Sequence, residues 1–176
     1  MRKFLGAVII LSVLLAGCAS TATVDGWKVY EDDEVYFEHP AQWVDLADEF
    51  DGFLDVVFAD RNAPSVPSVN LVVETSFYMM SADEIMDDVV KTYEGEIPGL
   101  SDFKLHDRGN IQVDNTAAGY LTYEVRSTQA DNFTEQMQVI VPKMNKIYYF
   151  TFTAQKGHFE SEKDTFSTII DTMKIK

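Results

Sequence analysis

Alternating apolar and polar positions predict β-strands along most of the chain. Two short strands are expected at residues 27–30 and 35–38, with an acidic turn between them and Pro40 after the second. Residues 53–59 and 69–77 also alternate, so each is expected to bury one face. The faces in question contain Leu54, Val56 and Phe58 in the first strand and Val69, Leu71, Val73, Thr75 and Phe77 in the second.

The second half of the chain is rich in the same pattern. The predicted strands are 103–106, 110–113, 120–126, 134–141 and 147–154. The last of them is apolar on both faces, so it needs cover on both sides and is expected in the centre of a sheet. Residues 131–132 and 144–145 predict hairpin turns between the final strands.

Two amphipathic helices accompany the strands. Ser81 and Glu84 have the spacing of a capping box, in which each side chain accepts a hydrogen bond from a backbone amide at the helix start. The apolar stripe of this helix consists of Ala82, Ile85, Met86, Val89, Val90 and Tyr93. Gly95 and Pro98 end it. A closing helix at 160–173 has its stripe at Phe166, Ile169, Ile170 and Met173.

Together these elements predict the α+β class. Strands in hairpin succession with two helices indicate a central antiparallel sheet of about six strands, with helices packed on its faces. The composition, 46% hydrophobic and 24% charged, is that of a globular protein. No linker or repeat divides residues 27–176, so we expect them to form a single domain.

The first eighteen residues resemble a lipoprotein signal. Arg2 and Lys3 precede an apolar run at residues 4–16, which is shorter than the roughly 20 residues needed to cross a bilayer. The run leads into Leu-Ala-Gly-Cys at residues 15–18, which resembles the lipobox of prokaryotic lipoproteins. That resemblance implies cleavage before Cys18 and attachment of a diacylglycerol to its sulfur.

We therefore expect a signal peptide at residues 1–17, a lipidated Cys18 with a short tether to residue 26, and an extracytoplasmic protein anchored to a membrane. The membrane is either an outer membrane or the outer face of the cytoplasmic membrane. Ala19 favours the outer membrane, by resemblance to the known sorting rule. The alternative is a buried structural cysteine beside an ordinary cleavage site.

Charge and cysteine content exclude several classes of protein. The chain has 29 Asp and Glu against 14 Lys and Arg, which argues against nucleic acid as a partner. Loss of Arg2 and Lys3 with the signal takes the net charge from −15 to −17. An anionic lipid surface should repel such a domain, which favours a partner above the membrane. One cysteine cannot form a disulfide framework or a clustered-cysteine zinc site.

Six segments occur in an order typical of one family. They are residues 35–43 (VYFEHPAQW), 70–73 (NLVV), the helix after Ser81, 119–123 (GYLTY), 148–154 (YYFTFTA) and 169–175 (IIDTMKI). In this order they resemble the PsbP-like family, which is named after an extrinsic photosystem II subunit and also contains prokaryotic lipoproteins and a Ran-binding import factor. The resemblance spans residues 27–176 and implies an α/β/α sandwich. It implies no activity, because its members bind different partners.

Motifs for catalysis are missing from the sequence. There is no Gly-x-Ser-x-Gly elbow and no phosphate-binding glycine loop, so we expect neither an enzyme nor a cofactor. The histidines have structural interpretations: His39 as a half-exposed turn residue, His106 at a strand end and His158 at the start of the last helix. Trp43 is expected in the core, because exposing its indole would forgo a large burial term. Asn132 begins a glycosylation sequon on a predicted turn.

The acidic turn is the candidate metal site. Glu31, Asp32, Asp33 and Glu34 offer the hard oxygen ligands that calcium or manganese prefers. Calcium loops, however, place ligands at alternate positions around a glycine, and four consecutive acids lack that pattern. A solvated turn in an acidic protein is therefore the favoured interpretation, and no metal is expected.

Three functional hypotheses follow. The first is a non-enzymatic, lipid-anchored binding or accessory module that contacts an unknown protein or a membrane complex through an acidic face. The second is a low-affinity divalent-metal-binding protein of the cell envelope that uses the acidic turn. The third is an enzyme whose site forms only in the fold, around His106 or His158.

Overall fold

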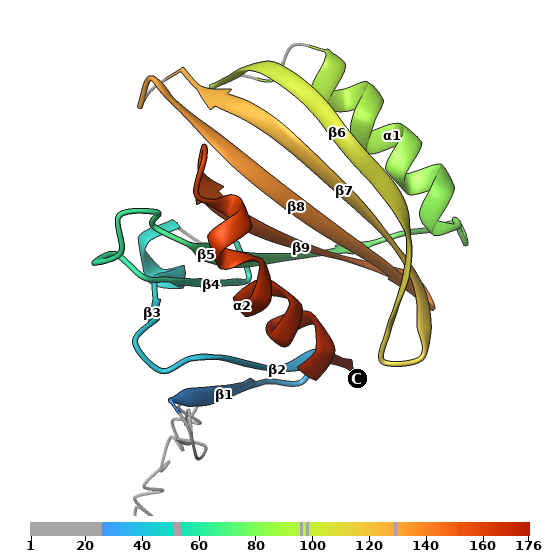
Figure 1. Ribbon diagram of the computed structural model, residues 1–176. Coiled ribbons are helices and arrows are strands. Elements are labelled where there is room, and N and C mark those ends of the chain that lie inside the picture. The colour runs from blue at the N-terminus through green and yellow to red at the C-terminus, as the bar shows by residue number, and fades with distance from the viewer. Residues whose placement is uncertain (1–25, 51–53, 96, 98, 129) are drawn as a thin grey trace, which may run out of the picture.

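The computed structural model describes residues 26–50, 54–95, 97, 99–128 and 130–176. These residues form a seven-stranded antiparallel sheet, a three-stranded sheet and two α-helices (Figure 1). The large sheet contains, in spatial order, β3 (Val44–Asp45), β4 (Val56–Ala59), β5 (Ser68–Thr75), β9 (Lys146–Gln155), β8 (Asn132–Lys143), β7 (Thr116–Ser127) and β6 (Leu100–Val113). The small sheet contains β1 (Trp27–Glu31), β2 (Val35–Pro40) and β10 (Lys174–Ile175).

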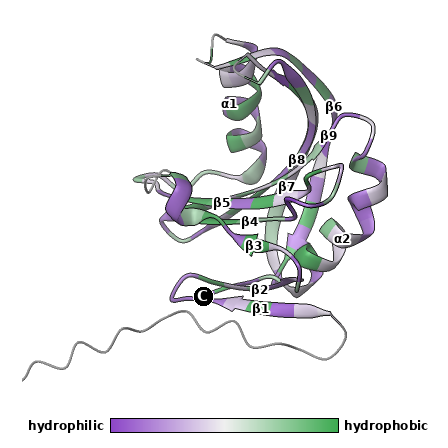
Figure 2. Cartoon of the chain, turned by 90° about the vertical axis from the view of Figure 1, so that its left-hand side faces the viewer, coloured by the Kyte–Doolittle hydropathy of each residue, from purple (hydrophilic) through white to green (hydrophobic). Residues whose placement is uncertain are grey.

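The large sheet lies between two layers (Figure 2). Helix α1 (Ala82–Glu94) packs on β6, β7 and β8, and helix α2 (Phe159–Thr172) packs on β9 and on β2 of the small sheet. A 3-10 turn, η1 (Ala47–Phe50), follows β3. The α+β class and the sandwich are therefore confirmed, with seven strands in the main sheet instead of about six. Within the described residues, neither helix is long and apolar enough to cross a membrane.

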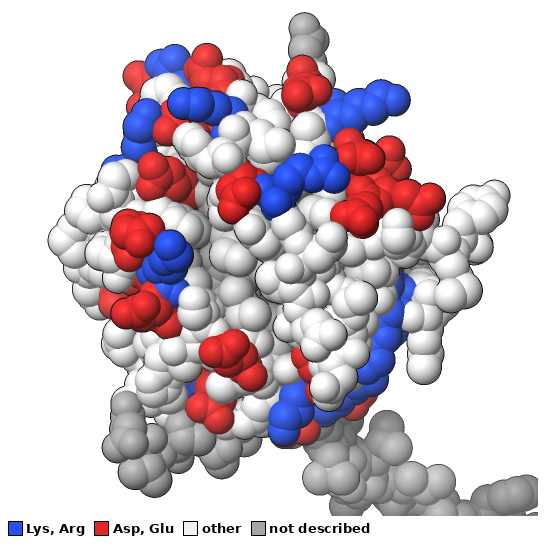
Figure 3. Space-filling view, turned by 45° about the vertical axis from the view of Figure 1, so that its right-hand side comes forward, with Lys and Arg blue, Asp and Glu red and all other residues white. Residues whose placement is uncertain are grey.

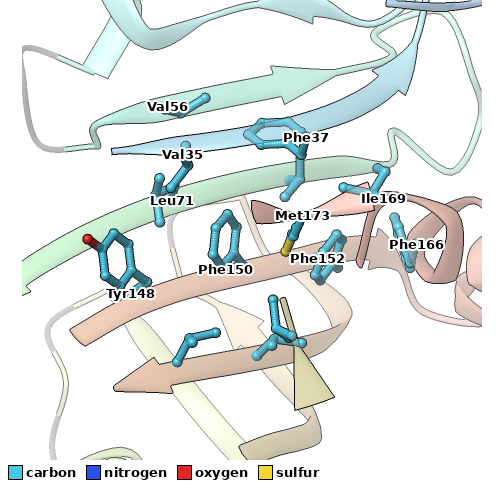
Figure 4. Close-up of a cluster of buried hydrophobic side chains, with 14 of the residues drawn as sticks. Val35, Phe37, Val56, Leu71, Tyr148, Phe150, Phe152, Phe166, Ile169 and Met173 are labelled. Carbon is cyan, nitrogen blue, oxygen red and sulfur yellow. The ribbon is translucent and has the colours of Figure 1, made fainter. Parts of the chain in front are cut away.

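Two hydrophobic cores occupy the two faces of the large sheet. On the α2 side, Phe150 and Phe152 of β9 pack with Phe37 of β2, and the Phe37 and Phe150 ring centroids lie 6.3 Å apart (Figure 4). On the α1 side, Ile147 of the same strand packs with Leu121 of β7. Strand β9 thus contributes to both cores and lies inside the sheet, as its apolar sequence predicts.

Helix α1 begins with the predicted capping box. Ser81 Oγ accepts a hydrogen bond from Glu84 N at 3.3 Å, and Glu84 Oε2 accepts one from Ser81 N at 2.8 Å. The helix lies close to the sheet because β7 has a glycine beneath it. A Cβ on Gly119 would come within 2.7 Å of Met86 Sδ.

Two strand predictions need correction. Segments 103–106 and 110–113 belong to one long strand, β6, which stays paired to β7 through two register shifts. Strand β5 ends at Thr75, so Phe77 lies outside it. Strand β5 ends where its partner strand begins. Thr75 lies opposite Lys146, which is the first residue of β9, and the residues before Lys146 form the turn from β8. No partner strand extends to Phe77, and its side chain is 93% exposed.

Candidate functional site

The acidic turn between β1 and β2 uses its carboxylates to hold its own shape. Asp32 Oδ1 accepts hydrogen bonds from the backbone amides of Glu34 and Val35, at 2.7 and 2.8 Å. Asp32 Oδ2 accepts one from the Tyr30 hydroxyl at 2.7 Å. Glu31 forms an ion pair with Lys176 at 2.9 Å. These contacts fold the turn and attach it to the C-terminal residue.

Glu34 joins the small sheet to the large one. It forms an ion pair with Lys146 and accepts a hydrogen bond from the Tyr148 hydroxyl at 2.9 Å. The hydrogen bonds from Lys146 and Tyr148 lower the pKa of the Glu34 carboxyl. Burial, together with the bond to Glu34, raises the pKa of Tyr148 to about 12. The role that these contacts assign to Glu34 is structural.

No group of three or more His, Cys, Asp or Glu side chains is placed to hold a metal ion within the described residues. Glu31, Asp32 and Glu34 contact two lysines, two tyrosines or backbone amides, as given above. Metal binding by the turn stays an untested alternative, and no contact among the described residues favours it.

His39 is buried, and the expectation of a half-exposed turn residue is wrong. Strand β2 alternates, so His39 points inward with Val35 and Phe37, and only 1% of it is exposed. Its ring stacks on Phe58 with centroids 4.0 Å apart. Nδ1 lies 3.0 Å from the Pro40 carbonyl oxygen, to which the neutral ring donates, and Nε2 has no partner. Burial lowers the pKa of His39.

This burial predicts a loss of stability in mild acid. Below pH 6.5, the ordinary pKa of histidine, the unfolded chain binds a proton at His39. The folded protein binds this proton only at a lower pH, because burial lowers the pKa of His39. The contribution of His39 is therefore complete above pH 6.5 and is lost as the pH falls from there towards the folded pKa. We expect urea unfolding to show a larger drop in stability between about pH 7.5 and about pH 5.5 for the wild type than for His39→Phe. His106→Gln, at an exposed position, is the control, and an unchanged drop in His39→Phe would refute the assignment.

His106 lies in a hollow of about 580 Å³ between the large sheet and α2. We call this site the α2 hollow. Its lining includes His106 and Asp107 of β6, Tyr120 of β7, Glu135 and Met137 of β8, and Phe159, Glu160, Lys163, Phe166 and Ser167 of α2. Partly buried Met137 and Phe159 contribute apolar surface, whereas carboxylates and one lysine supply charge.

Only some of these groups are bound to one another. The Tyr120 hydroxyl donates to Asp107 Oδ2 at 2.9 Å, and this bond raises the pKa of Tyr120. Lys163 pairs with Glu160 at 3.3 Å. Among the described residues, no hydrogen bond links His106 to a carboxylate or to a hydroxyl. The hollow thus holds more acids than bases, and its histidine is not part of a relay of the kind that activates a nucleophile.

A second feature lies where α1 begins. Phe77, Tyr78 and Met79 of the β5–α1 loop are 93%, 79% and 93% exposed, and Met144 in the β8–β9 turn is 84% exposed. We call these four side chains the apolar pole. Exposed apolar clusters of this kind mark interaction surfaces in soluble proteins. The alternating sequence pattern placed Phe77 in a strand, which is wrong. The capping box at Ser81 showed only that residues 77–80 precede the helix.

The remaining residues singled out in the sequence are located as follows. Trp43 is buried, as predicted, and its ring packs edge-on against Phe166. Asn132 begins β8 and His158 precedes α2. Cys18, with the predicted signal and the tether up to residue 25, lies outside the described residues. The residues of the α2 hollow come from four separate elements, so the linear sequence contains no signal that unites them.

Comparisons with known proteins agree on the fold. The family model for PsbP-like proteins matches residues 18–175. The solution structure of cyanobacterial PsbP from Synechocystis aligns with a TM-score of 0.65 at 16% identity, over 92% of this chain and 99% of that one. No curated protein gave a significant match.

Two further solved structures are similar. LpqN of Mycobacterium tuberculosis, described as involved in cell envelope biogenesis, has a TM-score of 0.56 at 12% identity, covering 82% of this chain and 86% of its own. A protein of unknown function from Pseudomonas aeruginosa, described as a putative regulator, has a TM-score of 0.51 at 18% identity, covering 81% and 92%. At such identities the likeness is one of fold.

Proposed function

The chain belongs to the PsbP-like protein family, and from that premise we propose that it is a lipid-anchored, extracytoplasmic accessory module that binds a protein partner and catalyses no reaction. The family resemblance read from the sequence is confirmed by the match over residues 18–175. Binding, rather than chemistry, is the function that the described side chains support best.

The α2 hollow is the observation that carries this proposal. Asp107, Glu135 and Glu160 outnumber its one lysine, and partly buried Met137 and Phe159 contribute apolar surface. A lysine or arginine side chain is complementary to this lining. Its apolar stem packs on the apolar side chains, while its charged end contacts the carboxylates. We therefore assign the hollow to a basic segment of a protein partner.

The same hollow gives little support to an enzyme. General acid–base catalysis needs a base within hydrogen-bond reach of the group that it activates. His106 has no such partner among the described residues, and the Tyr120 hydroxyl is already bound to Asp107 at 2.9 Å. These contacts favour a binding site over a catalytic one.

The anchor rests on the N-terminal sequence. The charged start, the short apolar run and the only cysteine of the chain occur in register, and the family match begins at residue 18 itself. Similarity of fold to a mycobacterial protein of envelope biogenesis is in keeping with an extracytoplasmic location. Two or more acyl chains on Cys18 would hold the module at the membrane surface.

Photo-crosslinking in native membranes tests the proposed partner site. A benzoylphenylalanine at Ser167, which lines the α2 hollow, is expected to give a discrete crosslinked protein. Thr168 is the matched control, because it is the next residue of α2, is also exposed and does not line the hollow. Glu135→Gln with Glu160→Gln should remove the Ser167 product, because it neutralises two carboxylates of the α2 hollow. The same products from both positions, or a product that survives neutralisation, would contradict the proposal.

A further inference from the structure

The apolar pole combines two segments that are distant in the sequence and meet in the fold. The amide of Ser76 donates to the carbonyl oxygen of Asn145 at 2.8 Å, which ties the β5–α1 loop to the β8–β9 turn. Tyr78, Met79 and Met144 line one hollow of about 250 Å³. The Ser76 hydroxyl also donates to the Tyr78 carbonyl oxygen at 2.6 Å. The loop is therefore held in position, and its apolar side chains still point outward.

The pole differs in charge from the rest of the protein. The chain contains 29 acidic residues, yet none lies in the segments 75–82, 116–117 and 142–146 that form and surround the pole. Two lysines, Lys143 and Lys146, flank Met144, and Lys146 forms the ion pair with Glu34 described above. In Figure 3, uncharged side chains project at the right-hand edge of the molecule, between a group of acidic side chains and a run of basic ones. The pole itself is therefore uncharged on an acidic protein.

Met144 adopts an unusual backbone conformation for a methionine. Its φ is +58°, in the left-handed region that hairpin turns usually fill with Asn, Asp or Gly. No packing compensates for the strain, because the side chain is 84% exposed. Strained backbone that presents an unpacked apolar side chain suggests a binding role for that side chain.

From these observations we propose that the apolar pole inserts into the interfacial region of a lipid bilayer. Phe77 and Met79 project from the surface, each 93% exposed, and a bilayer accepts a projecting apolar group without needing a matching pocket. Tyr78 has the amphipathic ring that favours the headgroup level, and methionine adapts to irregular surroundings. No carboxylate lies among the four side chains of the pole, so insertion brings no negative charge into the layer of phosphate groups.

The lipid contact is distinct from both the anchor and the α2 hollow. Because the protein is acidic overall, an anionic membrane repels it, and an approach that begins with the pole places uncharged side chains at the front. Insertion therefore gives the tethered domain a fixed orientation at the surface. It requires neither acylation of Cys18 nor a protein partner, so it is testable in the absence of both.

Vesicle binding by the unacylated mature chain, residues 18–176 with Cys18→Ser, tests the insertion. With phosphatidylcholine vesicles at millimolar lipid, we expect a measurable bound fraction on sedimentation. Phe77→Ser with Met79→Ser should lower the partition coefficient at least about tenfold. The control is Val44→Ser with Phe50→Ser, which removes partly exposed apolar side chains elsewhere and should change binding less than twofold. Equal loss in both variants, or no binding by the parent chain, overturns the proposal.

A fluorophore locates the contact. Because Cys18→Ser leaves the chain without cysteine, Met79→Cys provides a single site for an environment-sensitive NBD label. We expect vesicles to raise and blue-shift its emission, and to leave a label at Thr168→Cys unchanged. Sedimentation equilibrium without lipid completes the test. Self-association that Phe77→Ser with Met79→Ser abolishes would identify a second copy, not lipid, as the occupant and would overturn the proposal.

Salt dependence separates insertion from simple charge attraction. On vesicles of phosphatidylcholine and phosphatidylglycerol, salt should increase binding, because it screens the repulsion of the acidic body. Attraction through Lys143 and Lys146 alone would instead weaken with salt. Glu135→Gln with Glu160→Gln tests the α2 hollow and should leave binding to phosphatidylcholine unchanged. Failure of the proposed partner site is therefore distinguishable from failure of the proposed lipid contact.

Discussion

Replacing Phe150 with alanine should lower the free energy of unfolding by about 3–5 kcal/mol. Phe150 is fully buried in the central strand β9, where its ring packs edge-on against Phe37 of the small sheet. Truncation removes the contact between the two sheets and leaves a cavity that the surrounding strands fill only in part. Urea titration at neutral pH, monitored by circular dichroism, measures the change.

Phe77→Ala is the matched control for Phe150→Ala. The same ring is removed from a position that is 93% exposed, so the change in stability should stay within about 0.5 kcal/mol. The pair also separates folding from binding, because Phe77 belongs to the apolar pole. A large loss of stability in Phe77→Ala would mean that the pole packs in solution and is not free to insert.

Changing Cys18 to alanine is expected to abolish acylation and mature processing completely. Lipidation requires the cysteine sulfur, and an apolar run at residues 4–16 is too short for a stable membrane span. The variant should therefore be unlabelled by radioactive fatty acid and should appear as an unprocessed or released species. Detergent phase partitioning and intact mass measure both effects.

Ser20→Ala provides the comparison for Cys18→Ala. It changes a small polar residue in the same segment and leaves residues 15–18 intact, so processing and partitioning should match the wild type. Unchanged mass and membrane retention in Cys18→Ala would refute the lipoprotein interpretation and leave the fold and the α2 hollow unaffected.

Local signals in the sequence predicted the features that local physics determines. The capping box at Ser81 marked the start of α1 because both of its hydrogen bonds join residues three positions apart. The apolar run at 147–154 identified the central strand because burial on both faces leaves no charged positions. The class of the fold followed from the order of such elements.

Features that depend on distant partners escaped the same reasoning. Alternation carried the predicted strand through to Phe77, because a pattern contains no information on where the neighbouring strand turns. His39 was assigned to a turn although it continues the inward series of Val35 and Phe37. The α2 hollow unites Asp107, Glu135 and Glu160 through the register of three strands and the packing of a helix.

The pairing of β2 with β10 has a consequence for the order of assembly. The hairpin near the start of the domain is completed by Lys174 and Ile175, and Lys176 N donates to Glu34 O at 2.9 Å. On the export route proposed above, the chain crosses a membrane from its N-terminus and delivers residues 174–176 long after β2. The small sheet then closes only once these residues have crossed, and contacts so far apart in sequence make this a slow folding step. Until β10 pairs with it, the edge of β2 that receives Lys174 and Ile175 stays open, and an unpaired strand edge is prone to aggregation.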